Sequence, residues 1–240
     1  MIPKKFIAKF DSKKQLTSNV WQLDFEVPEN QPIEFIAGQY LILDCEGKGK
    51  RMYSIASLPS ENNRFTFIAN YFPGGLASEY FMEMQKGQDI SFVGPLGKFM
   101  INKTDASKIF LITGTGIAPA WSMINFALSN KSNFDIKLFW GLKNLNDTYF
   151  QNELKSLATN FKNFEYQFCI SRESIDIDIK STNFFQGRFT DALKQREDKI
   201  NLFLHSEFYL CGSGKIVEET KSFLRDMGVG RERIFYERFD

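Results

Sequence analysis

The stretch Arg51-Met52-Tyr53-Ser54-Ile55-Ala56-Ser57 combines a predicted β-strand with three side chains that suit a bound phosphate compound. β-Forming residues run through it, and Leu58-Pro59-Ser60 then predicts a turn. A guanidinium can bind phosphate, a phenol ring can stack on a planar ligand, and a hydroxyl can hydrogen-bond to a heteroatom. Arg51, Tyr53 and Ser54 are therefore candidate ligand-binding residues. Strand alternation alone places Tyr53 and Ser54 on opposite faces of the strand.

A second stretch, Pro73-Gly74-Gly75-Leu76-Ala77-Ser78-Glu79-Tyr80-Phe81, predicts a turn followed by the start of a helix. A glycine pair at this position lets the backbone approach a phosphate closely. The free N–H groups and the positive end of the helix dipole also favour negative charge. The two stretches together predict an anion site beside an aromatic ring, which suits an aromatic ligand that carries a diphosphate.

Length and composition exclude several classes of protein. A chain of 240 residues, 43% hydrophobic and 25% charged, suits two globular domains. A net charge of +1 gives no reason to expect nucleic acid or an anionic membrane as a partner. We find no membrane-spanning run and no signal peptide, so we expect a cytoplasmic protein.

Histidine and cysteine usage excludes other chemistry. The single histidine, His205, argues against histidine-rich zinc sites and against Ser-His or Cys-His nucleophiles, and we expect no metal site. Three widely spaced cysteines, Cys45, Cys169 and Cys211, fit a reducing compartment better than a disulfide framework. They do not form the cluster that a plant-type iron–sulfur domain needs, so we expect any iron–sulfur partner to be another polypeptide.

The first part of the chain predicts a small antiparallel β-barrel. Six short strands are expected over residues 4–10, 20–27, 39–44, 51–56, 64–72 and 89–93, with one helix near 76–84. Gly94-Pro95-Leu96-Gly97 and Asn102-Lys103-Thr104-Asp105 then break the pattern. We place a domain boundary near residue 103.

The second part alternates strands and helices, which predicts a doubly wound parallel sheet. The expected strands span 108–113, 136–140, 164–170, 207–211 and 233–237, and the expected helices lie near 117–129, 147–160, 190–196 and 214–227. In such sheets ligands bind beyond the carboxyl ends of the strands. The segments at those ends are Thr113-Gly114, Gly141, Ser171-Arg172 and Cys211-Gly212.

Three further motifs follow in order: Ile112-Thr113-Gly114-Thr115-Gly116-Ile117-Ala118-Pro119, Tyr209-Leu210-Cys211-Gly212-Ser213-Gly214, and Phe235-Tyr236-Glu237-Arg238-Phe239. With the Arg-x-Tyr-Ser and Gly-Gly-x-x-Ser motifs, the series resembles the ferredoxin-NADP reductase superfamily over nearly the whole chain. The resemblance implies an FAD-binding barrel over residues 1–103 and an NAD(P)-binding α/β domain over 104–240. It favours FAD over FMN, because the arrangement is similar to that of two-domain FAD reductases.

The resemblance also implies roles for single residues. In the family the arginine binds the flavin diphosphate, the tyrosine packs on the isoalloxazine, and the serine lies near flavin N5. The implied FAD-binding residues are Arg51, Tyr53, Ser54, Ile55, Gly75, Leu76, Ala77, Ser78 and Phe239. Those implied for the nicotinamide dinucleotide are Gly114, Thr115, Gly116, Ser171, Arg172, Arg188, Cys211 and Gly212. Ser54, Cys211 and Glu237 are the implied catalytic residues; Cys211 would position the nicotinamide and would not act as a nucleophile.

The choice between NADPH and NADH depends on cations near two predicted strand ends. Ser171-Arg172-Glu173 and Gly187-Arg188-Phe189 resemble sites that bind the 2′-phosphate in some bacterial NADPH reductases. A second arginine of those enzymes is replaced here by the Gly141-Leu142-Lys143-Asn144 stretch, in which Lys143 is a possible point charge. We favour NADPH, and NADH stays open.

The resemblance implies an FAD-dependent NAD(P)H reductase that passes electrons to a separate redox protein such as a ferredoxin, a flavodoxin or an oxygenase component. The segment Asn70–Tyr80 is most similar to reductases of bacterial multicomponent oxygenases. Two alternatives remain. One is a flavin reductase that releases reduced flavin. The other is a non-catalytic electron-transfer subunit of a larger complex.

Overall fold

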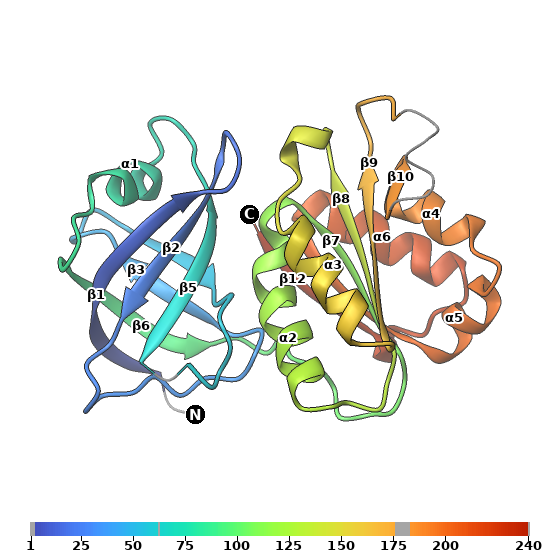
Figure 1. Cartoon of the computed structure of the whole chain (residues 1–240), viewed down its shortest axis with the longest axis horizontal. Coiled ribbons are helices and arrows are strands. Elements are labelled where there is room, and N and C mark those ends of the chain that lie inside the picture. Colours follow the sequence, from blue (N-terminus) through green and yellow to red (C-terminus); the bar gives the residue numbers. More distant parts are fainter. Residues whose placement is uncertain (1–2, 62, 176–182, 240) are drawn as a thin grey trace. The chain divides into compact units, whose positions relative to one another are not determined.

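The computed structural model describes residues 3–61, 63–175 and 183–239. By its internal contacts the chain divides into one unit of Met1–Ile101 and Ala118–Asn130 and a second unit of Asn102–Ile117 and Lys131–Asp240. Figure 1 shows the elements of both units. The expected boundary between separate domains near residue 103 stays a prediction.

The first unit contains a six-stranded antiparallel sheet that curls into a near-closed barrel. Its strands are β1 (Lys4–Gln15), β2 (Val20–Glu26), β3 (Tyr40–Asp44), β4 (Lys50–Ser54), β5 (Arg64–Asn70) and β6 (Asp89–Leu96). Their order in the sheet is β4-β3-β6-β1-β2-β5, and an isolated bridge between Ile55 and Phe67 brings the two end strands together. Helix α1 (Leu76–Glu83) follows β5. The predicted barrel with one helix is confirmed.

Aromatic rings from alternating strand positions fill the barrel. The rings of Phe25, Phe65 and Phe92 lie with each pair of centroids 5.1 Å apart, and all three side chains are fully buried. Each such ring stabilises the fold by roughly 1.5–3 kcal/mol through burial. Ala77 and Phe81 of α1 join the same core. The helix is therefore anchored on the barrel by its apolar face.

Strand β6 continues through Gly94 and Pro95, where the sequence predicted a break. The pairing of β3 with β6 shifts at this point: Tyr40 pairs with Leu96, whereas Ile42 pairs with Val93. Two residues of β6 thus lie opposite one of β3, which is a β-bulge, and proline is tolerated at bulges because no ladder hydrogen bond is required there. The prediction was wrong because a Gly-Pro pair can mark a bulge as well as the end of a strand.

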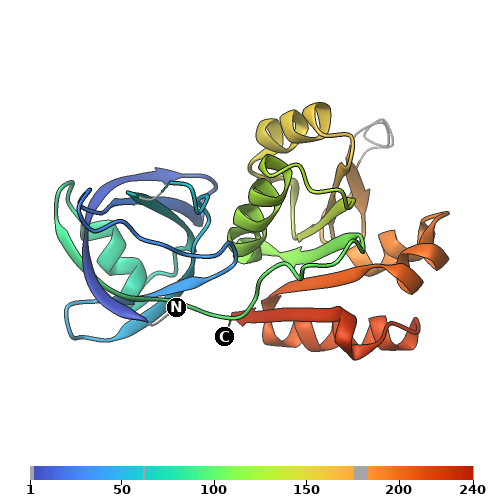
Figure 2. The ribbon, with the colours of Figure 1, turned by 90° about the horizontal axis from the view of Figure 1, so that it is seen from below.

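The second unit contains a six-stranded parallel sheet with helices on both faces. Its strands are β7 (Lys108–Thr113), β8 (Ile136–Leu142), β9 (Phe164–Ile170), β10 (Phe184–Gln186), β11 (Glu207–Ser213) and β12 (Ile234–Phe239), in the order β10-β9-β8-β7-β11-β12. The helices are α3 (Gln151–Asn160), α4 (Phe189–Gln195), α5 (Lys199–His205) and α6 (Gly214–Asp226). Figure 2 shows α3 and α6 on opposite faces of the sheet. The predicted doubly wound parallel sheet is confirmed.

A further helix, α2 (Ile117–Ser129), follows the short 3-10 turn η1 (Gly114–Gly116). From Ala118 onward its residues group with the first unit, where Ser122 Oγ donates a hydrogen bond of 2.6 Å to the carbonyl of Ser57. None of the helices within the described ranges is long and apolar enough to cross a membrane.

A buried ion pair joins the beginnings of β7 and β11. Lys108 is fully buried, and its Nζ lies 2.8 Å from Oε2 of Glu207. The same carboxylate accepts hydrogen bonds from Tyr209 Oη at 2.9 Å, Asn102 Nδ2 at 3.0 Å and Thr104 Oγ1 at 2.8 Å. Such a pair is tolerated in the interior because every remaining polar atom finds a partner. The network ties residues 102–108 to the sheet.

Candidate functional site

Strand β4 presents a guanidinium to solvent and a tyrosine to the barrel. Arg51 is exposed, and its Nη1 donates a hydrogen bond of 2.8 Å to the carbonyl of Lys50. The ring of Tyr53 stacks on Phe67 at 5.3 Å and meets Phe81 edge-on at 5.4 Å. Burial raises the pKa of the Tyr53 hydroxyl above its usual value, so this group stays protonated. It can therefore donate a hydrogen bond at neutral pH.

The two residues after Tyr53 are buried. Ser54 is 5% exposed, and the Ile55 side chain is fully buried in the barrel core. The Ile55 N–H donates to the carbonyl of Gln39 at 2.9 Å. The Ile55 side chain therefore helps to hold the end of β4 in the barrel.

The N-terminus of α1 is an open set of backbone donors. Its N-cap, Gly75, makes no side-chain cap hydrogen bond. The N–H groups of the first helical residues, Leu76, Ala77 and Ser78, have no acceptor inside the helix. Gly74 has a φ of +73°, a left-handed conformation that favours glycine. A Cβ at Gly75 would lie 2.9 Å from the carbonyl oxygen of Phe72, so only glycine fits there without a shift.

Two side chains of α1 fix the loop that precedes the helix. Ser78 Oγ accepts a hydrogen bond of 2.9 Å from the Phe72 N–H, which leaves its own hydroxyl proton available to a ligand. Glu79 Oε1 accepts hydrogen bonds from the Gly74 N–H at 2.8 Å and from Tyr71 Oη at 3.2 Å. The loop and the helix start therefore form one braced element.

Gly49 brings the arginine and the helix start together. A Cβ built at Gly49 would lie 2.6 Å from Leu76 Cδ2 and 3.9 Å from Arg51 Nη1. The guanidinium and the first residue of α1 thus approach the same point of the β3–β4 connection. Two motifs that are separated in the sequence form a single cationic, donor-rich site in the first unit, which fits the diphosphate of FAD.

In the second unit, the backbones at the carboxyl ends of β7 and β11 touch. A Cβ at Gly116 would lie 2.5 Å from the carbonyl oxygen of Cys211, and one at Gly212 would collide with Thr113 Oγ1. Glycine at both positions permits this approach. Trp140 Nε1 donates a hydrogen bond of 3.0 Å to the carbonyl of Gly114 and so fixes the turn. These strand ends lie at the edge of the sheet where doubly wound folds bind dinucleotides.

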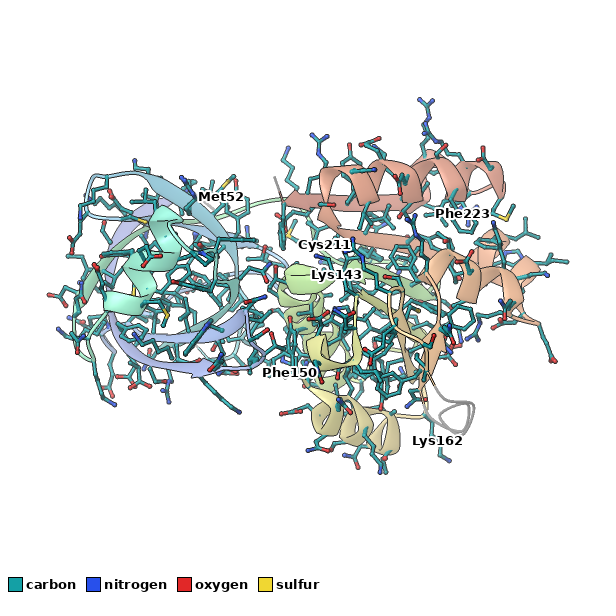
Figure 3. The ribbon with its side chains drawn as sticks, turned by 90° about the horizontal axis from the view of Figure 1, so that it is seen from above. Met52, Lys143, Phe150, Lys162, Cys211 and Phe223 are labelled. Atoms are coloured by element: carbon teal, nitrogen blue, oxygen red, sulfur yellow. The ribbon has the colours of Figure 1, made fainter. Side chains whose placement is uncertain are left out.

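Cys211 is 1% exposed, and Figure 3 shows its side chain within the second unit. Burial raises the pKa of its thiol well above the usual value, and the charge of Glu237 raises it further. The two residues are register partners on β11 and β12, as are Ser213 and Phe239. A thiol held neutral is a poor nucleophile, so this cysteine suits a packing role.

The arginines implicated in nucleotide choice follow neighbouring strands. Ile170, the last residue of β9, pairs with Gln186, the last residue of β10, so Arg172 and Arg188 each lie two residues beyond a matched pair. Ser171 Oγ donates a hydrogen bond of 3.1 Å to the carbonyl of Leu142. The side chains of Arg172 and Arg188 are exposed at the same edge of the sheet.

Sequence reasoning found the motif residues but missed three supports of the site. Gly49 lies in a turn whose partner, Leu76, is 27 positions later, and nothing local indicates the contact. The sequence predicts Glu79 only as part of a helix start and Trp140 only as the end of a strand. A carboxylate in the first turn of a predicted helix, such as Glu79, is a usable signal, because the free N–H groups at a helix N-terminus attract negative charge.

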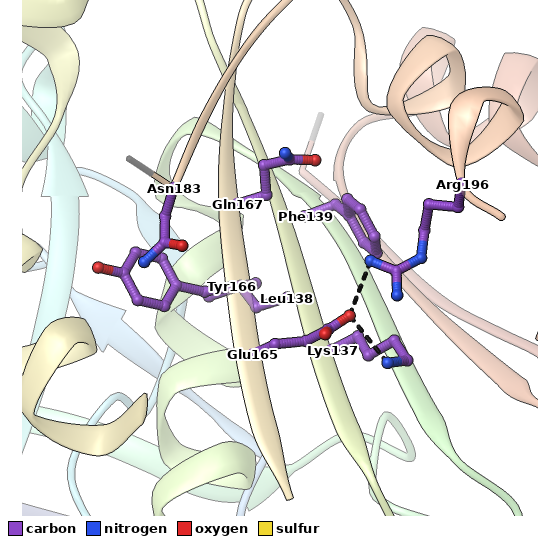
Figure 4. Close-up of a pocket in the computed structure, with 8 residues that line it drawn as sticks. All are labelled: Lys137, Leu138, Phe139, Glu165, Tyr166, Gln167, Asn183 and Arg196. Atoms are coloured by element: carbon purple, nitrogen blue, oxygen red, sulfur yellow. Dashed lines mark hydrogen bonds and ion pairs between the residues drawn. The ribbon is translucent and has the colours of Figure 1, made fainter. Parts of the chain in front are cut away.

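The structure also contains a hollow of about 180 Å³ at the amino-terminal halves of β8 and β9 (Figure 4). Glu165 Oε1 lies 2.8 Å from both Lys137 Nζ and Arg196 Nη1. These three charged side chains of the hollow therefore already pair with one another. The volume is below the roughly 300 Å³ of a typical ligand pocket, and ligands of doubly wound sheets bind at the other end of the strands. This hollow is therefore separate from the candidate nucleotide site.

Comparison with known proteins identifies two family matches. Residues 8–101 match the oxidoreductase FAD-binding domain, and residues 110–222 match the oxidoreductase NAD-binding domain. The reductase component of propane 2-monooxygenase from Gordonia sp. (strain TY-5) is 26% identical over 97% of this chain, which spans 67% of that protein's length. Ferredoxin-NADP reductase B from Sorangium cellulosum is 27% identical over 98% of both chains.

A solved cytochrome P450 reductase from Amycolatopsis has the same fold, with a TM-score of 0.87 at 23% identity over 99% of this chain and 70% of its own. The two matched domains, in this order on this fold, place the chain in the ferredoxin-NADP reductase superfamily of flavin-dependent NAD(P)H oxidoreductases.

Proposed function

We propose that this chain oxidises NAD(P)H with bound FAD and passes the electrons to a separate redox protein, such as a ferredoxin, a flavodoxin or an oxygenase component. The observation that carries the proposal is a pair of glycine-lined, donor-rich sites, one on each sheet. The first combines Arg51 with the start of α1, and the second combines η1 with Cys211. The names of the similar reductases support the acceptor class.

In the first unit, Arg51 and the N–H groups of Leu76, Ala77 and Ser78 would bind the FAD diphosphate, and the Ser78 hydroxyl would add a donor. Tyr53 would pack on the isoalloxazine, and its protonated hydroxyl would donate a hydrogen bond. Ser54 would donate a hydrogen bond near flavin N5. The braced loop before α1 supports these roles because it fixes the donors before the ligand arrives.

In the second unit, the turn Gly114–Gly116 would bind the nicotinamide dinucleotide through its backbone. Cys211 would position the nicotinamide by packing, and Gly212 would allow the ring to approach. Glu237 and Phe239, two residues apart and so on the same face of β12, would close the site and exclude water. Bound FAD would supply the hydride acceptor and release electrons singly, so no side chain needs to titrate in the reaction.

We infer a preference for NADPH, because Ser171, Arg172 and Arg188 gather beyond β9 and β10, where they could bind a 2′-phosphate. We also infer a reducing compartment, such as the cytoplasm, because Cys45, Cys169 and Cys211 are all unpaired.

Anaerobic stopped-flow absorbance of the purified protein, mixed in turn with NADPH and NADH, tests the proposal. We expect rapid bleaching of the oxidised-flavin band, faster with NADPH, and transfer of the electrons to an added ferredoxin. A yellow protein that neither nucleotide bleaches contradicts the enzymatic function. A colourless protein that needs added flavin for turnover favours the flavin reductase that releases its product.

A further inference from the structure

Glu219 on α6 lies between two cations of the second unit. Its Oε2 lies 3.4 Å from Arg188 Nη1, and its Oε1 lies 3.9 Å from Lys215 Nζ. The Arg188 side chain is 72% exposed and that of Glu219 is 47% exposed. Both cations thus already share one carboxylate at the surface.

The position of this pair matters because Arg188 follows the end of β10, beside the end of β9 that leads to Arg172. In the function proposed above, on which this inference rests, Arg188 binds the 2′-phosphate of NADPH. A phosphate bound to Arg188 would compete with Glu219 for the N–H groups of Nη1 on the same guanidinium. It would also bring two negative charges close to a fixed carboxylate.

We propose that Glu219 is a specificity-determining residue that weakens binding of the 2′-phosphorylated nucleotide. Its carboxylate competes with the phosphate for Arg188 and repels the phosphate, and it leaves the shared part of NADPH and NADH unaffected. The NADPH preference that the arginines create is thereby kept smaller than the arginines alone would make it.

The size of the effect follows from the exposure of the pair. An exposed ion pair is screened by water and salt, so its removal changes affinity by up to about fivefold. The effect therefore tunes the nucleotide preference and does not reverse it.

Isothermal titration calorimetry of the FAD-loaded protein with 2′-phospho-AMP and with AMP tests the inference. In Glu219→Gln, which keeps the side-chain shape and removes the charge, we expect the Kd for 2′-phospho-AMP to fall by up to about fivefold. The Kd for AMP should stay within about twofold, since AMP has no phosphate at this position. Added salt should shrink the difference between variant and wild type.

Glu218→Gln is the matched control. It lies next to Glu219 on the same helix, but its carboxylate lies 2.9 Å from Lys221 and 3.9 Å from Arg238 instead. It should leave both Kd values unchanged. In the double variant Arg188→Gln/Glu219→Gln, the gain for 2′-phospho-AMP should disappear, because the cation that the phosphate would use is gone.

The outcomes separate this inference from the proposed function. If the wild-type protein is reduced by a nicotinamide nucleotide but Glu219→Gln binds 2′-phospho-AMP no better, or gains equally for AMP, the inference is wrong and the proposed function stands. If neither NADPH nor NADH reduces the flavin and neither nucleotide fragment binds, both are overturned.

Discussion

Cys211 illustrates how burial alone can set the role of a reactive side chain. The thiol is 1% exposed and its pKa is raised, so it carries no charge at physiological pH. Its backbone lies against Gly116, the last residue of the turn η1 that follows β7. A neutral sulfur in this place can fill space beside a ligand but cannot attack it.

Replacement of Cys211 by alanine should slow flavin reduction without loss of FAD. Removal of the sulfur lets the nicotinamide shift, and a shift of about 1 Å can slow a reaction by as much as 10²-fold, so we expect a decrease of roughly tenfold or more. Stopped-flow bleaching of the flavin by NADPH measures the rate. Cys169→Ala is the control, since Cys169 is buried in the sheet core on β9. Equal rates in both variants and the wild type would exclude a positioning role.

At the scale of elements, the loop before α1, part of the proposed FAD site, is braced by hydrogen bonds to two side chains of the helix. Ser78 and Glu79 hold the N–H groups of Phe72 and Gly74, and Gly75 has no room for a Cβ. The free N–H groups at the start of α1 are thus held in position before any ligand binds.

Gly75→Ala should weaken FAD binding. The added methyl would lie 2.9 Å from the Phe72 carbonyl oxygen, so the loop must shift away from the helix start. We expect roughly a tenfold rise in the Kd for FAD, equivalent to the loss of one charge-assisted hydrogen bond of about 1.5 kcal/mol. Fluorescence titration of the apoprotein with FAD measures it.

Gly87→Ala is the control for Gly75→Ala. Gly87 has a φ of +83° in a turn where a Cβ would meet nothing within 4 Å. The substitution should lower the free energy of unfolding by about 1 kcal/mol and leave the Kd for FAD unchanged. An equal rise in Kd for both variants would mean that general destabilisation, and not the loop, weakens binding.

Most elements could be predicted from the sequence because their apolar patterns are local. β7 is a continuous buried run, and α2 begins directly after a glycine-rich turn. β10 was missed because three residues are too few for a periodic signal, and α5 because its seven residues follow a polar segment. The place of β10 at the edge of the sheet comes from packing, which the pattern of one segment does not contain.

The candidate site could be predicted as motifs but not as an arrangement. The Gly-Gly pair and the Gly-Thr-Gly turn carry their own physical reason, close backbone approach. The contact of Gly49 with Leu76 and the pairing of Arg188 with Glu219 depend on which chain segments meet in the fold. Neither residue type nor spacing indicates such partners.

At the scale of the whole molecule, the ion pair of Lys108 and Glu207 bears on stability, because both of its side chains are buried. Glu207→Gln keeps the shape but leaves the buried ammonium without its counter-charge, which should lower the free energy of unfolding by about 3–5 kcal/mol. Urea unfolding followed by circular dichroism measures the loss. Asp89→Asn, which breaks an exposed pair with Lys9, should cost less than about 1 kcal/mol. A loss in Glu207→Gln as small as in this control would contradict a structural role for the buried pair.

The same pair predicts a pH dependence. Burial by itself would raise the pKa of Glu207, but hydrogen bonds led by the one from Lys108 outweigh it and hold the pKa below the usual value. The stabilisation is therefore complete above the unfolded pKa of about 4.3 and is lost as pH falls through the lower pKa of the folded state. The wild type should lose stability more steeply than Glu207→Gln below about pH 4. If the free energy of unfolding fell equally with pH in both proteins, the lowered pKa would not belong to Glu207.

The separation of the two charges, 99 positions in the sequence, also has a consequence during translation. All six barrel strands lie before residue 97, so their pairings can form early in the nascent chain. Lys108, by contrast, leaves the ribosome long before its partner, Glu207, has been synthesised. The pairing of β7 with β11 therefore cannot form, and Lys108 has no Glu207 to pair with, until the ribosome has passed residue 207.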